Sequence, residues 1–384
     1  MQSRFLATLL LFSCVIAFAA DAPRVIAMRS PNGGIQPQAA VDSRGVMHVV
    51  YYKGDAGGGD LFYVRQQPGD TSFSKPIRVN SQPGSAIAAG SIRGAQLAIG
   101  KGDRIHVVWN GGNDAKKVSV AGKEVTPLLY TRSNGDAFEP ERNIITRNAG
   151  LDGGSAVAAD TIGNVSVFWH GSAPDNTDKE AGRALFVARS TDDGATFAPE
   201  IPALAKRTGA CGCCGMKAVA DSRGAVFALF RPATGMTERG ETLVVSRKPG
   251  APFEAVFTDP WQANQCPMSS ASIFPTANGA LLGWETGGDI KFASLDLQNL
   301  AVTKPKSPIG GARRKHPFVT SNARGDVLWV WTEGTAWAKG GTVAWQFNAK
   351  DNPLAPELGR ADGLPVWSLP TAVAKADGSF VVLY

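Results

Sequence analysis

The sequence predicts an all-β protein, a single β-propeller of four-stranded antiparallel blades, on the strength of three observations. A short phrase recurs along the chain: an extended stretch, a turn rich in Gly, Asn and Asp, and an apolar strand ending in an aromatic residue. Glycine (44) and proline (24) are abundant among the 384 residues and only 19% are charged, which disfavours coiled coils, helical solenoids and disordered chains. No segment shows the periodicity of an amphipathic helix.

The recurring phrase marks the first hairpin of each predicted blade. Its turn residues tolerate a positive φ, and the following strand is rich in Val, Ile, Phe and Trp, as expected of a half-buried strand. The seven copies end 47 to 61 residues apart, at Tyr51, Trp109, Trp169, Phe230, Trp284, Trp331 and Tyr384.

A second hairpin follows the first in six of the seven repeats. Its strands are expected at 61–65, 127–131, 184–188, 242–246, 290–294 and 342–346. A propeller blade typically consists of four strands within about 45–60 residues. The extended segment 24–29 is then left to join the last hairpin and close the ring. The repeat count therefore gives seven blades, one of them short.

The first twenty residues have the pattern of a secretory signal peptide. Arg4 supplies a positive charge, an apolar stretch runs over 5–20, and alanines at 19 and 20 suit cleavage. The stretch is too short and wrongly flanked for a membrane span. We expect a signal peptide at 1–20 and a propeller domain at 21–384, exported to the periplasm or the extracellular space. A lipoprotein anchor at Cys14 is the less favoured alternative.

One turn between a third and a fourth strand carries a recognisable motif. Residues 190–197 match the pattern S-x-D-x-G-x-x-F without a gap, and 246–253 keep the spacing with Lys248 in the aspartate position. This is the Asp-box, and over essentially the whole mature chain the protein resembles the sialidase-like (BNR-repeat) propeller superfamily. The resemblance implies six blades, against the seven of the repeat count. The box itself predicts structure and no chemistry; its residues are Ser190, Asp192, Gly194 and Phe197.

The unusual side chains of the chain are predicted to gather on one face. Strands in a blade alternate in direction, so the loops before each blade and those between second and third strands lie opposite the Asp-box turns. Propellers and similar scaffolds carry their sites on such loops. These loops hold His170, Arg231, Arg239, Glu285, Arg313, Arg314, His316, Glu333 and four cysteines.

The resemblance implies specific roles for some of these residues. Sialidases hold a carboxylate with three arginines, a task that suits the planar guanidinium fork, and use a tyrosine nucleophile with a partner glutamate and an acid. Ligand-binding candidates are Arg231, Arg239, Arg313, Arg314, His170 and His316. Catalytic candidates are Glu285, Glu333 and Tyr52. The N-terminal Phe-Arg-Ile-Pro motif of the family is missing, which puts sialidase activity in doubt.

Four cysteines remain once Cys14 leaves with the signal peptide: Cys211, Cys213, Cys214 and Cys266. Cys211 and Cys266 each precede a hairpin glycine by 13 residues, which places them at equivalent positions in neighbouring blades. Disulfides, with Cys266 bonded to one of the other three, are one interpretation. A copper or zinc site is a second, with Met216, Met268, His170 and His316 as further donors. A redox-active dithiol is a third.

The sequence thus favours an exported sialidase-like propeller that binds a polar or anionic ligand, a glycan, on the face of the Cys/Arg/His loops. This interpretation requires no cofactor. The alternatives are a glycoside hydrolase of the exo-α-sialidase type and a thiol-based copper, zinc or redox module. The net charge of +6 suits an anionic small ligand and is too weak to indicate nucleic acid. We expect a carbohydrate or other anionic partner, no membrane span and a monomer.

Overall fold

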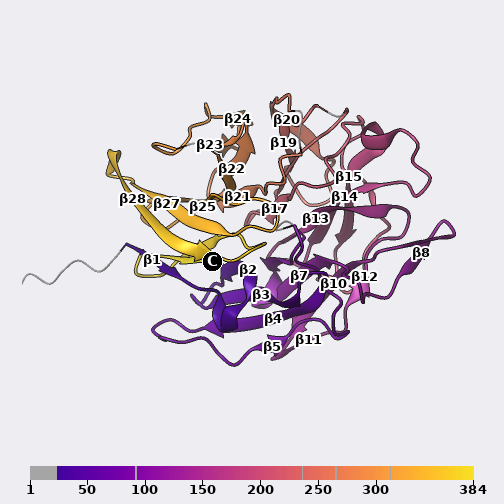
Figure 1. Cartoon of the computed structure of the whole chain (residues 1–384), viewed down its shortest axis with the longest axis horizontal. Coiled ribbons are helices and arrows are strands. Elements are labelled where there is room, and N and C mark those ends of the chain that lie inside the picture. Colours follow the sequence, from indigo (N-terminus) through magenta and orange to yellow (C-terminus); the bar gives the residue numbers. More distant parts are fainter. Residues whose placement is uncertain (1–23, 91–92, 236, 264–265, 312) are drawn as a thin grey trace, which may run out of the picture.

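The computed structural model describes residues 24–90, 93–235, 237–263, 266–311 and 313–384, which form a ring of seven β-sheets (Figure 1). The predicted signal peptide lies outside the described residues. Six of the sheets are antiparallel blades that run outward from the axis in chain order. The propeller predicted from the repeats is therefore confirmed, with seven blades rather than the six that the family resemblance implied.

Blades 1 to 3 come from the first half of the chain, and blade 2 carries a separate two-stranded hairpin, β8 and β9, as an insertion. Their strands are β2 (Ile35–Val41), β3 (Met47–Asp55), β4 (Gly58–Gln66) and β5 (Ile77–Arg78); β6 (Gln96–Ile99), β7 (Ile105–Asn110), β8 (Val118–Val120), β9 (Lys123–Val125), β10 (Leu128–Asn134), β11 (Ala137–Phe138) and β12 (Arg142–Asn143); and β13 (Ala149–Ala159), β14 (Val165–Ser172), β15 (Arg183–Ser190) and β16 (Ile201–Pro202).

Blades 4 to 6 follow the same order from axis to rim. Their strands are β17 (Lys217–Ala220), β18 (Val226–Phe230), β19 (Glu241–Ser246) and β20 (Glu254–Asp259); β21 (Ser272–Thr276), β22 (Gly279–Thr286), β23 (Asp289–Asp296) and β24 (Ala301–Val302); and β25 (Arg314–Ser321), β26 (Val327–Glu333), β27 (Gly341–Ala349) and β28 (Asn352–Leu364). The helical elements of the described chain are three 3₁₀ turns: η1 (Pro31–Gly33), η2 (Lys101–Asp103) and η3 (Lys179–Gly182).

Blade 7 joins the two ends of the described chain. It contains β29 (Thr371–Ala374), β30 (Phe380–Leu383) and β1 (Val25–Met28). β1 pairs with β30 in parallel, from Val25 opposite Phe380 to Met28 opposite Leu383. The extended segment at 24–29 therefore closes the ring, as the sequence predicted, and the seventh blade is the short one.

The apolar core lies between the blades, because each sheet packs both faces against its neighbours. Each interblade layer is a separate cluster of buried residues, and the strand-end aromatics Trp109, Trp169 and Trp284 are almost fully buried in three of them. Truncating a buried aromatic costs roughly 3–5 kcal/mol, so these side chains define the blade spacing. The seven innermost strands lie side by side around the axis and line a channel.

The Asp-box turn of blade 3 forms as its residue pattern predicts. Ser190 Oγ accepts from Gly194 N at 2.9 Å, and Asp192 accepts from the backbone and hydroxyl of Thr196 at 2.9 and 2.6 Å. Gly194 has a φ of +74°, and a Cβ there would lie 1.9 Å from the hydroxyl of Tyr130. Phe197 packs edge-on against the Tyr130 ring in the neighbouring blade, at 4.9 Å between centroids. The box therefore fixes a turn and joins two blades.

The described residues contain no helix that is long and apolar enough to cross a membrane.

Candidate functional site

The four cysteines meet where the loops before blades 4 and 5 adjoin. Their Sγ atoms all lie within 4.8 Å of one another. Cys213 and Cys266 form a disulfide, whereas Cys211 and Cys214 are free and buried. The Sγ of Cys211 lies 3.3 Å from that of Cys214 and 3.5 Å from that of Cys213. The predicted disulfide from Cys266 to one of the other three cysteines is confirmed, and the remaining two thiols stay close to it.

Backbone hydrogen bonds hold both loops at this point. The N–H of Cys211 donates to the carbonyl of Arg231 at 2.9 Å, which ties the cysteine loop to the end of β18. The N–H of Gly215 donates to the carbonyl of Ser269 at 2.9 Å, which ties it to the loop before β21. The side chains of Cys211 and Cys214 pack against Ala233. The sulfur cluster thus rests on three segments of two neighbouring blades, here called the cysteine centre.

The guanidinium of Arg231 is a fully buried cation whose charge acts on both Cys211 and Cys214. Its Nη2 lies 3.1 Å from Glu241 Oε2 and donates to the carbonyl of Glu285 at 2.8 Å. Burial raises the pKa of Glu241, whereas the charge of Arg231 lowers it, so the two groups form a buried ion pair. The charge of Arg231 also acts on the thiols of Cys211 and Cys214, where it favours the anionic form of each sulfur.

The two free thiols differ in their ionisation. The hydrogen bond between the Cys211 and Cys214 sulfurs, helped by the charges of Arg231 and Arg239, lowers the pKa of Cys211 to about 7. Burial raises the pKa of Cys214 well above its ordinary value. Cys211 therefore carries the thiolate of the pair and Cys214 carries the proton, which is an arrangement suited to metal binding or to thiol exchange.

The predicted ligand-binding arginines already have anionic partners. Arg239 Nη2 lies 3.1 Å from Glu180, and Arg314 binds Asp289 in a bidentate geometry, with contacts of 2.7 and 3.0 Å. Arg313 is exposed and has a φ of +61°. The guanidinium groups of three of these arginines thus already bind partners inside the protein: Arg231, Arg239 and Arg314. The structure does not bring them together around an open carboxylate pocket.

The two predicted histidines are buried near the centre without joining the sulfur group. Within the described parts of the chain, neither ring nitrogen of His170 makes a hydrogen bond of ordinary geometry, and the ring lies beside the backbone of Cys211. His316 Nδ1 lies 3.3 Å from the hydroxyl of Ser270. Burial lowers the pKa of both imidazoles to about 3, so both are neutral at pH 7. Met216 packs in the core between blades 3 and 4, and Met268 lines a small cavity beside His316.

The three predicted catalytic residues lie in separate environments. The Tyr52 hydroxyl donates to the carbonyl of Asp55, and burial raises the pKa of Tyr52. Glu333 accepts from the indole of Trp331 at 2.9 Å. Glu285 is buried near Arg231, and burial raises its pKa. Among the described residues, no hydrogen bond joins Tyr52 to either glutamate, so the tyrosine–glutamate pair of a sialidase is not assembled here.

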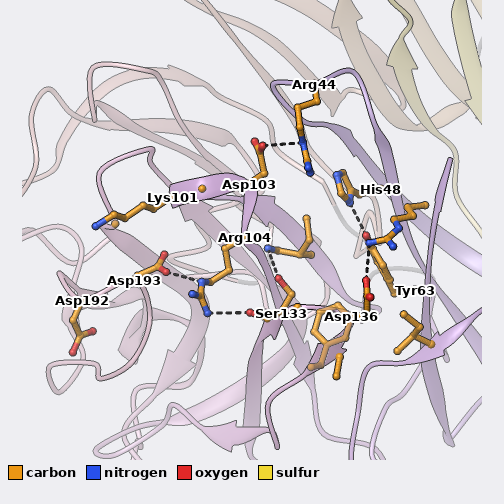
Figure 2. A pocket seen from close by; sticks show the side chains of 18 of the residues that line it. Arg44, His48, Tyr63, Lys101, Asp103, Arg104, Ser133, Asp136, Asp192 and Asp193 are labelled. Atoms are coloured by element: carbon orange, nitrogen blue, oxygen red, sulfur yellow. Dashed lines mark hydrogen bonds and ion pairs between the residues drawn. The ribbon is translucent and has the colours of Figure 1, made fainter. Parts of the chain in front are cut away.

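The opposite face holds a cavity of about 680 Å³ that sequence reasoning missed. Figure 2 shows how charges line it in pairs, with Arg44 facing Asp103 and Arg104 held between Asp193 and Ser133. The pairs Arg44–Asp103 (3.4 Å) and Arg104–Asp193 (2.7 Å) each join two neighbouring blades. We call this cavity the ion-pair groove.

Two histidine–tyrosine pairs repeat behind the ion-pair groove. His48 Nδ1 lies 2.7 Å from the Tyr63 hydroxyl, and His106 Nδ1 lies 2.7 Å from that of Tyr130. Both histidines are the second residue of the second strand of their blade. The signal that could have found them is the repetition of His-Val-Val at 48–50 and 106–108.

Comparison with known proteins supports the fold of the chain and no particular activity. No family model matches, and no curated protein matches the chain. Among solved structures, the α-L-arabinofuranosidase Arb93A of Fusarium graminearum with an iminosugar inhibitor is 9% identical with a TM-score of 0.50, covering 88% of this chain and 94% of its own. The complex of NanB with Optactamide is 10% identical with a TM-score of 0.51, covering 83% and 68%.

A Hadza microbial sialidase is 11% identical with a TM-score of 0.49, covering 83% of this chain and 69% of its own. Identities this low show the fold alone. The propeller fold that the Asp-box resemblance implied is confirmed.

Proposed function

We propose that the protein is an exported β-propeller whose functional centre, after a dithiol reductant has opened the Cys213–Cys266 disulfide, is a thiolate metal site formed by Cys211, Cys213, Cys214 and Cys266. The observation that carries the proposal is that all four Sγ atoms lie within 4.8 Å of one another. Around a tetrahedral zinc ion with metal–sulfur bonds of about 2.3 Å, sulfur atoms stand about 3.8 Å apart. The contacts of 3.3 and 3.5 Å from Cys211 are already near that spacing.

The surroundings favour sulfur anions at this point. Arg231 supplies a buried positive charge, which lowers the pKa values of both Cys211 and Cys214 although Glu241 lies 3.1 Å from its guanidinium. A cation beside a thiol stabilises its thiolate, which is the form that binds metals. The donor set is all sulfur, which suits Zn²⁺ and Cu(I) and disfavours Mg²⁺ or Ca²⁺.

A thiol–disulfide module is the second candidate function, and the disulfide between Cys213 and Cys266 favours it. Forming that bond from two thiols releases two electrons and two protons, and a dithiol reductant returns them while becoming a disulfide itself. Cys211 and Cys214 have the C-x-x-C spacing of redox dithiols, yet both are buried. Burial of the more acidic thiol hinders direct attack by a protein partner, so we rank this function second.

The decisive experiment counts thiols and metal in the same sample of mature protein. Thiols are titrated after denaturation, with and without prior reduction, and metal is measured by elemental analysis. Four free thiols with about one equivalent of zinc or copper support the metal site. Two disulfides, no bound metal, and no uptake of Zn²⁺ or Cu(I) after reduction with a phosphine would overturn it. A reversible disulfide without metal uptake would establish the second candidate.

Glycan binding on this face, sialidase-type hydrolysis and export remain predictions. The engaged forks of Arg231, Arg239 and Arg314 provide no open carboxylate site, so the geometry favours the cysteine centre over a sugar site. A panel of sialylated and neutral glycans, applied to the metal-loaded and metal-free protein, tests binding directly. Cell fractionation with mass determination of the mature N-terminus tests cleavage after residue 20.

A further inference from the structure

Two cavities follow one another along the propeller axis. The lower cavity, which is the one farther from the cysteine centre, has a volume of about 350 Å³. It is lined by all seven innermost strands, and many of its lining residues are alanines. The upper one, about 30 Å³, is lined by six of the seven blades on the side of the cysteine centre. Lys217 and Phe318 line both cavities. These two side chains therefore stand at the boundary between the cavities.

The Lys217 ammonium has neutral partners only. Its Nζ donates to Gln96 Oε1 at 2.8 Å and to Gln38 Oε1 at 3.2 Å, from two other blades. Among the residues that the structure describes, no carboxylate lies within 4.0 Å of this nitrogen. Burial lowers the pKa of Lys217 to about 8, so the amine is still largely protonated at neutral pH.

Lys217 is only partly exposed, and a charge without a counter-ion is costly in such a place, because amide oxygens replace only part of its hydration. An ammonium also has three donors, and the two glutamines use two of them. The lower channel cannot supply compensation, since strands β6, β13 and β17 present residues such as Ala98, Ala158 and Ala218 to it. A bound water would accept the third hydrogen bond and leave the charge uncompensated.

We propose that the axial channel is a binding site for a small monovalent anion of halide size, held by Lys217 above the alanine-lined cavity. The upper cavity, of about 30 Å³, has room for an ion of the size of chloride beside the ammonium. The ion accepts from the third ammonium hydrogen, while Gln38 and Gln96 fix the direction of the amine. This site is separate from the cysteine centre and does not depend on its function.

The test uses thermal unfolding of the full mature protein in sodium chloride and in sodium gluconate at equal ionic strength, because gluconate is too large for the upper cavity. We expect chloride to raise the wild-type midpoint by about 2 °C through binding to the folded state. Lys217→Met should lose this rise. Lys206→Met removes the same charge from an exposed surface position and should keep it.

Diffraction from crystals soaked in bromide gives an independent readout on the wild-type protein, which also covers the case that Lys217→Met fails to fold. An anomalous peak within hydrogen-bond distance of Nζ at about 20 mM bromide supports the site. An equal chloride effect in wild type and Lys217→Met would overturn the proposal. So would the absence of a bromide peak, or a peak that appears only at molar bromide.

Discussion

The two faces of the propeller differ in how their charges are balanced. The ion-pair groove is wide, yet its arginines are paired, among them Arg44 with Asp103 and Arg104 with Asp193. On the opposite face the cavities are small, but the ammonium of Lys217 contacts two neutral amides. A large cavity can thus be a by-product of blade assembly, while a small site with uncompensated charge indicates a ligand.

The largest expected effect concerns the cysteine centre. Cys214→Ser should lower the affinity of the reduced protein for Zn²⁺ by more than 100-fold, because loss of an outer partner alone costs 10- to 100-fold and a direct ligand costs more. A competition titration with a chromophoric chelator measures the change. Asp192→Asn on the Asp-box face is the matched control and should leave affinity unchanged. Equal affinities of the wild type and Cys214→Ser for Zn²⁺ would mean that the cysteine centre is not the metal-binding site, so that metal binding would not distinguish the two faces.

The second effect compares two arginines of opposite faces by denaturant unfolding. Arg231→Met should reduce the free energy of unfolding by about 3 kcal/mol, because it leaves Glu241 and two carbonyls without a buried partner. Arg104→Met removes a partly exposed ion pair and should cost about 1 kcal/mol or less. Similar losses of unfolding free energy for the two variants would mean that the buried ion pair contributes no more to stability than the partly exposed one.

The third effect is a pH dependence of the stability of the protein, which arises from a histidine on the side of the ion-pair groove. Burial lowers the pKa of His106 to about 3, against about 6.5 in the unfolded chain. Between these values the unfolded state binds one more proton than the folded state, so stability falls as pH decreases from 6.5 to 3. His106→Gln should reduce that slope by about 1.4 kcal/mol per pH unit. An unchanged slope would show that His106 takes up its proton in the folded protein.

The smallest effect belongs to the Asp-box. Asp192→Ala removes the acceptor of two hydrogen bonds from Thr196 on an exposed turn. Water replaces these bonds readily, so we expect a loss below about 1 kcal/mol in thermal or denaturant unfolding. A loss as large as that of Arg231→Met would mean that the Asp-box turn contributes as much to stability as the buried arginine of the opposite face.

The fold was predictable because its signals are local. The turn glycines, the strand-end aromatics and the Asp-box each act within a few residues, and their repetition gave the number of blades and the role of segment 24–29. Equivalence in the repeat also placed Cys211 beside Cys266. These features need only the order of residues along the chain.

The environment of the site was harder to predict, because it depends on partners distant in sequence. Arg239 and Arg314 suggested a ligand cluster, but Glu180 and Asp289 come from other loops and engage them. Lys217 gave no signal, since its place in the channel follows from the closure of seven blades. The ion-pair groove also arises between blades, and only the repeated histidine of His48 and His106 hinted at it.

The closure of the ring has a mechanical consequence. β1 runs parallel to β30, so Arg24 lies beside Phe380 at one end of the ladder and Met28 beside Tyr384 at the other. A force applied through Arg24 and Tyr384 would slide the two strands along each other and load their hydrogen bonds together, including those of 2.8 and 3.2 Å at the two ends. An antiparallel closing strand would instead open one bond at a time. The short blade is therefore built to resist pulling at its termini.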